Sequence, residues 1–214
     1  MARSEVEVVK HSPRPRVSRV MVGFSTPRQW NVLSALIRSA TGSRTSHAWV
    51  QVHDPLFGRD LVLEAHATGL RLVPFTVFNL TNRVVAVAYP KCDLEGGLEA
   101  AGAWLGARFD FEGLVGLFVE LVARHFGRHW KNVLHGSTAL FCSEAVTRML
   151  QAGGFPRAAT LTPQDTTPED LLEFLARDPS RCRIEYEKGV AKTPTRRRLG
   201  RLAKRARRER RRGA

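Results

Sequence analysis

A cysteine at the start of a predicted helix is the residue best suited to nucleophilic chemistry in this sequence. After Phe141, apolar residues recur at three- and four-residue spacing as far as Leu150, which predicts a helix with one buried face. Gly153 and its glycine neighbour end that helix. Cys142 therefore lies in the first turn, where unpaired N–H groups and the helix dipole favour a thiolate. The alternative is that Cys142 packs as a small apolar residue, since it shares the buried stripe.

A histidine on a predicted strand is the candidate base. Residues 45–53 alternate between apolar and other side chains, so His47 lies on the face opposite the apolar one, toward a groove or solvent. Residues 61–67 form a second predicted strand, antiparallel to the first, with Glu64 and His66 together on one face. Either side chain is well placed to lie beside His47 and hold its imidazole ring.

These residue types fit the requirements of a cysteine enzyme. A cysteine nucleophile needs a base within hydrogen-bond reach, and the base needs a third group that orients it. Cys142 and His47 supply the first two groups, and backbone N–H groups at the helix start supply an oxyanion site. Alternation leaves Glu64 and His66 both open as the third group. A carboxylate also stabilises an imidazolium, which favours Glu64.

The charge of the chain is concentrated at one end. The 214 residues carry a net charge of +14, and residues 189–214 alone hold twelve Lys and Arg against one Glu. We expect this basic tail to be disordered or helical only on binding, with nucleic acid or an anionic surface as a non-specific partner. The alternative is a solubilising tail with no partner. Residues 1–16 are predicted to be a flexible leader, and residues 17–188 a single nearly neutral domain.

Several classes of protein are disfavoured by composition. Three cysteines do not suggest a disulfide framework, and no run of eighteen apolar residues predicts a transmembrane segment. The N-terminus lacks the layout of a secretory signal, so we expect a cytoplasmic protein, or one carried in a phage particle or released by lysis. His125 and His129 are four residues apart, but no third ligand accompanies them. We therefore expect no metal and no cofactor.

The order of predicted elements indicates an α+β domain with an antiparallel sheet packed against helices. Ser25 to Pro27 is predicted to cap a helix after the first strand. The predicted strands are 17–24, 45–53, 61–67, 70–73, 84–89 and 183–187, and the later helices are 94–107, 112–129, the one that starts at Cys142, and 167–177.

An ordered set of motifs over residues 17–178 resembles the circularly permuted papain-like family related to NlpC, the YiiX/YebB-like cysteine amidases and peptidases. Residues 40–47 resemble the family's T-G-S-x-x-S-H signature. The other motifs follow in the family's order: Leu63-Glu64-Ala65, Arg108-Phe109-Asp110-Phe111, Phe141-Cys142-Ser143-Glu144 and Thr167-Pro168-Glu169-Asp170-Leu171. Phe109 stands where the family often has tyrosine.

The resemblance implies a permuted papain-like fold and a Cys-His-Glu triad of Cys142, His47 and Glu64. The expected activity is hydrolysis of an amide or peptide bond through a thioacyl-enzyme, with cell-wall-type peptide as a candidate substrate. One alternative is a thiol acyltransferase or lipid hydrolase, since the retinol acyltransferase group shares the permuted layout. The other is a non-catalytic protein that binds nucleic acid through its basic tail.

Overall fold

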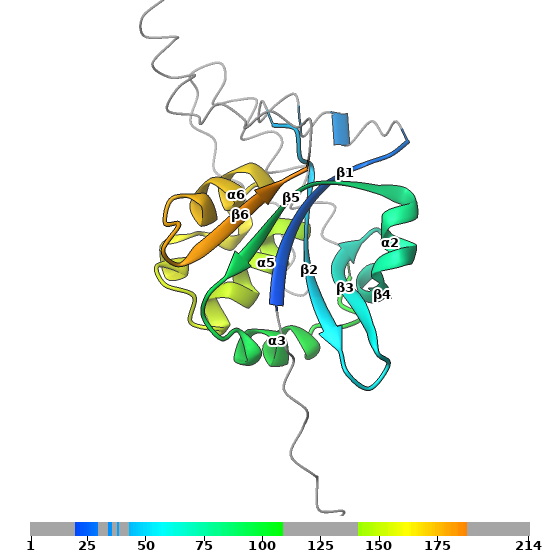
Figure 1. Ribbon diagram of the computed structural model, residues 1–214, viewed down its shortest axis with the longest axis horizontal. Coiled ribbons are helices and arrows are strands. Elements are labelled where there is room, and N and C mark those ends of the chain that lie inside the picture. The colour runs from blue at the N-terminus through cyan, green and yellow to red at the C-terminus, as the bar shows by residue number, and fades with distance from the viewer. Residues whose placement is uncertain (1–19, 30–33, 36–37, 39–42, 109–140, 188–214) are drawn as a thin grey trace, which may run out of the picture.

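The computed structural model describes residues 20–29, 34–35, 38, 43–108 and 141–187 (Figure 1). The expected leader, most of the helix expected after Pro27, the Phe109 motif, the expected helix 112–129 with its two histidines, and the basic tail lie outside the described residues.

A six-stranded antiparallel sheet forms the centre of the described chain, and the prediction of an α+β fold with an antiparallel sheet is confirmed. Its order is β4-β3-β2-β1-β5-β6, and every neighbouring pair is antiparallel. The strands are β1 (Val20–Pro27), β2 (His47–Asp54), β3 (Arg59–His66), β4 (Gly69–Pro74), β5 (Asn82–Pro90) and β6 (Cys182–Tyr186).

One face of the sheet carries the main hydrophobic core. Ala48 and Val50 of β2 lie on this face, and their ladder partners on β1 and β3 are apolar as well. Helices α3 (Glu95–Gly102), α5 (Cys142–Ala152) and α6 (Pro168–Ala176) contribute to the same core. In Figure 1, α5 lies behind the strands of the sheet. Alternating strand residues therefore bury one face against helices, as the apolar pattern of β2 predicts.

The opposite face carries a smaller aromatic cluster under a helix that the sequence did not predict. Helix α2 (Phe75–Thr81) follows β4, and its Phe78 packs against Trp49 with ring centroids 4.8 Å apart. Figure 1 shows α2 beside β3 and β4. Trp49 is fully buried, so the face that carries His47 is covered along part of its length rather than open to solvent.

The ends of α5 and α6 agree with their sequence signals. Helix α5 ends at Ala152, and Gly154 has a φ of 67°, a left-handed conformation that glycine adopts at little cost. Helix α6 begins after Thr167, whose hydroxyl accepts from the N–H of Asp170 while the Asp170 carboxylate accepts from the N–H of Thr167. This reciprocal capping box fixes where α6 starts.

Two predicted boundaries are wrong. Residues Ser25 to Pro27 belong to β1 rather than to a helix cap, because Ser25 pairs with His47 and Pro27 pairs with Asn82. Pairing with two neighbouring strands outweighs the local capping signal. The helix expected over 94–107 is shorter and ends at Gly102, after which the chain turns.

Candidate catalytic site

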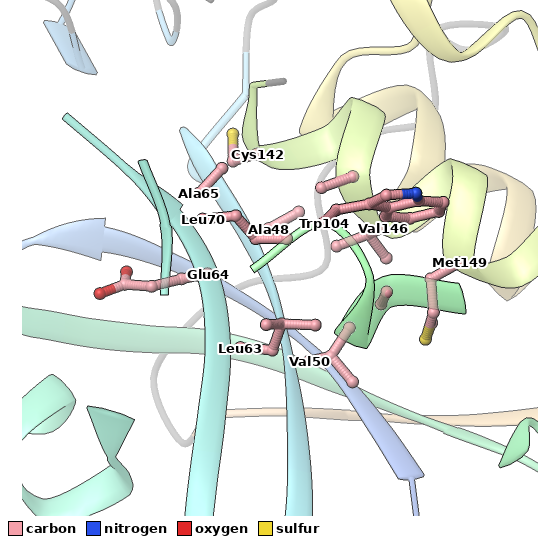
Figure 2. A pocket seen from close by; sticks show the side chains of 12 residues that line it. Ala48, Val50, Leu63, Glu64, Ala65, Leu70, Trp104, Cys142, Val146 and Met149 are labelled. Atoms are coloured by element: carbon pink, nitrogen blue, oxygen red, sulfur yellow. The ribbon is translucent and has the colours of Figure 1, made fainter. Parts of the chain in front are cut away.

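The first turn of α5 meets the start of β2, and this junction brings Cys142 to the sheet. Cys142 is 6% exposed, and its Sγ lies 4.0 Å from the carbonyl oxygen of Ser46. Phe141 is the N-cap residue and has no side-chain oxygen, so its side chain makes no capping hydrogen bond. Figure 2 shows Cys142 at the start of its helix beside Ala65 and Leu70. The N–H groups of this turn therefore remain available to a negative charge at the sulfur.

Hydrogen bonds to other elements hold residues 43–46, the segment that leads into β2. The backbone N–H of Ser46 donates to the carbonyl of Ser25 at 3.0 Å, and the Ser46 hydroxyl bonds the Ser34 hydroxyl at 2.6 Å. The Ser43 hydroxyl donates to the buried carboxylate of Glu169 at the start of α6. These bonds tie the segment to β1 and α6 and fix the backbone from which the first side chain of β2 projects.

His47 and Glu64 are in direct contact on one face of the sheet. His47 Nε2 and Glu64 Oε2 are 2.8 Å apart, and the two side chains are 16% and 3% exposed. Gln51 pairs with Val62, so the same register sets Glu64 opposite Trp49 and diagonal to His47. The predicted alternation of both strands therefore accounts for this contact.

The surroundings of the thiol and the imidazole shift their pKa values in opposite directions. Burial alone raises the pKa of Cys142, but a hydrogen bond and the charge of His47, with the backbone N–H groups of Ala48 and Ser143, bring that pKa below its ordinary value. Burial alone lowers the pKa of His47, but hydrogen bonds with Cys142 and Glu64, and their charges, raise that pKa to about 10. Both shifts favour a thiolate beside an imidazolium at neutral pH.

Glu64 is held as a carboxylate by two cations. Burial raises its pKa, but His47 and then Arg71 bring the pKa down to about 2. Arg71 Nε and Nη2 donate to Glu64 Oε1 at 3.1 and 2.7 Å, while Oε2 is the atom that faces His47. The carboxylate is therefore ionised at neutral pH.

His66, the rival third group, bonds its own turn instead of His47. Its Nδ1 lies 3.2 Å from the Thr68 hydroxyl and 3.4 Å from the Thr68 backbone N. Burial and then the charge of Arg71 lower the pKa of His66, which keeps the ring neutral. The structure thus brings together Cys142, His47 and Glu64, with His66 nearby but bonded elsewhere.

The other two cysteines lie in different surroundings. Cys92 is exposed and Cys182 is buried at the start of β6, and both are free thiols. Burial raises the pKa of Cys92, and it raises the pKa of Cys182 to about 11. Cys142 is therefore the cysteine of this chain with a lowered pKa.

A small, mostly enclosed apolar pocket lies between α5 and the sheet, with the thiol among its lining groups. Figure 2 shows its lining, with Cys142 at one end, Met149 further along α5, and Trp104 across from the strands. Glu64 contributes to the boundary, but its carboxylate points away from the apolar side chains. Its Oε2 contacts His47 instead. The thiol thus lies at the border between the apolar core and the charged side chains of His47 and Glu64.

The described part of the chain shows neither a metal-binding cluster nor a membrane-spanning helix. There, no group of three or more His, Cys, Asp and Glu side chains is arranged to hold a metal ion. None of the helices described has the length and apolar character needed to span a membrane.

Sequence reasoning missed Arg71 and the Ser43–Glu169 bond. One feature of the sequence could have indicated a role for Arg71: it is the one charged residue in an otherwise apolar predicted strand, two residues after a short turn. The register that pairs Glu64 with Arg71 follows from that turn, in which His66 pairs with Gly69. The Ser43–Glu169 bond joins residues 126 positions apart, and no local pattern predicts it.

No protein-family model matches this chain, and no curated protein matches it.

Proposed function

We propose that this protein is a cysteine hydrolase that cleaves an amide or peptide bond through a thioacyl-enzyme. Cys142 is the nucleophile, His47 the general base and acid, and Glu64 the group that orients His47. The observation that carries this proposal is the 2.8 Å contact between His47 Nε2 and Glu64 Oε2. The Cys142 thiol lies at the same end of β2, with its Sγ 4.0 Å from the carbonyl oxygen of Ser46, the residue before His47. Because Nε2 faces the carboxylate, the other ring nitrogen is left for the thiol.

In the acylation step, the Cys142 thiolate attacks the carbonyl carbon of the substrate and forms a carbon–sulfur bond. The carbonyl oxygen becomes an oxyanion, and backbone N–H groups at the start of α5, such as that of Ser143, are suited to stabilise it. The His47 imidazolium then donates its proton to the leaving nitrogen. The carbon–nitrogen bond breaks, the amine departs, and a thioester remains on Cys142.

In the deacylation step, His47 is neutral and acts as a general base. It takes a proton from a water molecule that attacks the thioester carbonyl. The carbon–sulfur bond breaks, the carboxylic acid departs, and the thiolate–imidazolium pair is restored. Glu64 holds the ring in one orientation throughout and stabilises its positive charge.

We also propose that the fold is the permuted papain-like, NlpC-type arrangement. Support comes from the order of the parts, with the histidine strand first and the cysteine helix later, and from the antiparallel sheet that carries the helix start at one end of β2. The contact of His47 with Glu64 rather than His66 favours an amidase over a Cys-His-His acyltransferase.

Thiol alkylation as a function of pH tests the nucleophile. Iodoacetamide is expected to label Cys142 well below pH 8.5, the ordinary pKa of a cysteine, because its lowered pKa leaves thiolate present there. The raised pKa values of Cys92 and Cys182 make them internal controls that label only at higher pH. Equal and slow labelling of all three thiols, mapped by peptide mass spectrometry, contradicts the assignment.

Hydrolysis is tested with a library of fluorogenic peptide amides and p-nitrophenyl acetate. We expect product release, an acyl group trapped on Cys142 by acid quench, and loss of both in Cys142→Ser with an almost unchanged Tm. A protein that alkylates readily at Cys142 but forms no acyl adduct and releases no product is not a hydrolase.

A further inference from the structure

Arg71 makes two hydrogen bonds to the carboxylate of Glu64, which in turn contacts His47, the candidate base. Glu64 and Arg71 are direct partners in the β3–β4 ladder, so both side chains lie on the same face. Two nitrogens of Arg71 donate to Glu64 Oε1, and the other carboxylate oxygen faces His47. Arg71 is 39% exposed while Glu64 is 3% exposed, so the guanidinium closes the solvent side of the pair. Charges thus alternate from Cys142 to Arg71.

The two half-reactions place opposite demands on His47. Before acylation, the thiolate and Glu64 both favour the imidazolium. After acylation the sulfur is neutral, yet His47 must now be a free base in order to accept a proton from water. An ionised Glu64 with no other partner would keep His47 protonated and slow deacylation. A cation on the far side of that carboxylate offsets this effect.

We propose that Arg71 is a positioning residue that acts through Glu64 to make His47 a free base in the acyl-enzyme. This inference rests on the proposed function. By occupying Oε1, Arg71 also leaves Oε2 as the oxygen for the imidazole, which fixes the ring against rotation. Arg71 touches neither the sulfur nor the reacting carbon, so its effect is expected mainly in the deacylation step.

Few other charged groups face His47 in the described residues. Glu64 and His66 come from β3, Arg71 from β4 and Cys142 from α5. Helix α2 presents Phe78, whose ring stacks on His47 with centroids 6.2 Å apart, and has no titratable side chain. The pKa of His66 is lowered by burial and by Arg71, so His66 adds no charge near neutral pH. Loss of the guanidinium therefore acts on His47 through Glu64.

The test measures deacylation against pH with p-nitrophenyl acetate as the probe. The acetyl group on Cys142 is followed by mass spectrometry after rapid removal of excess ester. Arg71→Met removes a nearby positive charge, so the midpoint of the deacylation profile is expected to move up by about one pH unit. Acetyl-enzyme then accumulates near neutral pH. Arg71→Lys keeps the charge and is expected to keep the midpoint, at a lower rate because the paired hydrogen bonds are lost.

A matched control exists in α5. Arg148 also makes two hydrogen bonds to a buried carboxylate, that of Glu144, at 3.1 and 2.8 Å, and is 36% exposed. Neither side chain is among the principal influences on the pKa of Cys142 or of His47. Arg148→Met is therefore expected to cost comparable stability while leaving the midpoint in place.

The outcomes separate the two proposals. A wild-type chain that forms no acetyl-enzyme on Cys142 overturns both the hydrolase function and this inference. A wild-type chain that acylates and deacylates, beside an Arg71→Met midpoint that does not move, overturns the role of Arg71 alone.

If Arg71→Met does not fold, Arg71→Gln replaces it. An NMR titration of His47 in a Cys142→Ser background, with and without the Arg71 change, gives the same answer without turnover. If the pKa of His47 is the same in the Cys142→Ser protein with and without the Arg71 change, the proposal is wrong.

Discussion

The choice between Glu64 and His66 is the sharpest question at the residue scale. Glu64→Gln keeps a hydrogen-bond acceptor beside His47 but removes the charge, so the pKa of His47 is expected to fall from about 10 and less ion pair to form. We expect the rate of amide hydrolysis to drop about a hundredfold or more. His66→Gln is expected to keep most of the activity, because His66 bonds Thr68 instead. The measurements are kcat on a peptide amide and the His47 titration by NMR.

The opposite pattern of activities in these two variants would assign the third catalytic position to His66. Full-rate hydrolysis by Glu64→Gln beside an inactive His66→Gln reverses the assignment and gives a Cys-His-His arrangement. The substrate search then moves from peptides toward acyl lipids. Because the two side chains lie two residues apart on one strand, the pair of variants also controls for general damage to β3.

Much of the candidate site at this scale follows from alternation alone. The period of two in β2 and β3 assigns His47 and Glu64 to one face, and the helix pattern after Phe141 assigns Cys142 to a first turn. Alternation does not choose between Glu64 and His66, because that choice depends on side-chain rotamers and on the turn that captures His66.

At the scale of elements, the close approach of α3 to α5 holds the cysteine helix against its neighbours. A Cβ built at Gly97 would lie 2.3 Å from the carbonyl oxygen of Met149, which is backbone and does not give way easily. Gly97→Ala is therefore expected to destabilise the fold by about 1–3 kcal/mol, measured by urea denaturation. Gly102 lies in the same helix with nothing near its Cβ position, so Gly102→Ala is the matched control.

The control variant, Gly102→Ala, is not expected to lower the free energy of unfolding. Alanine is a better helix former than glycine, and Gly102 is the last residue of α3, so Gly102→Ala is expected to be neutral or slightly stabilising. Equal destabilisation by both changes would show that α3 tolerates no side chain for some reason other than its approach to α5.

The elements most poorly predicted are those in which packing outweighs local signals. Helix α2 has the sequence FTVFNLT, whose aromatic and β-branched residues favour a strand. It is helical in the structure because Phe75 and Phe78 then reach the ring of Trp49 together. Residues Ser25 to Pro27 show the reverse case, where a capping signal yields to strand pairing.

At the scale of the whole molecule, the charged groups of the candidate site and the basic residues of the tail are different in composition and far apart in the sequence. The candidate site alternates thiolate, imidazolium, carboxylate and guanidinium, so its net charge is close to zero. The positive charge of the chain lies instead in residues 189–214, and residues 1–188 carry only +3. A near-neutral site has no general need of a basic tail, so catalysis and polyanion binding are expected to be separable.

Removal of residues 189–214 tests that separation. A chain that ends at Lys188 is expected to lose binding to double-stranded DNA, followed by fluorescence anisotropy, because it loses twelve of its 34 basic residues and only one acidic residue. If about six tail cations contact phosphates, the full chain should show a slope of about −5 in log K against log salt, with no dependence on base sequence. The labelling of Cys142 and its pH dependence should be the same in both chains, since the described groups that lower its pKa are His47 and the backbone N–H groups of Ala48 and Ser143. Tight DNA binding by the truncated chain would contradict this prediction and locate the polyanion surface on the domain itself.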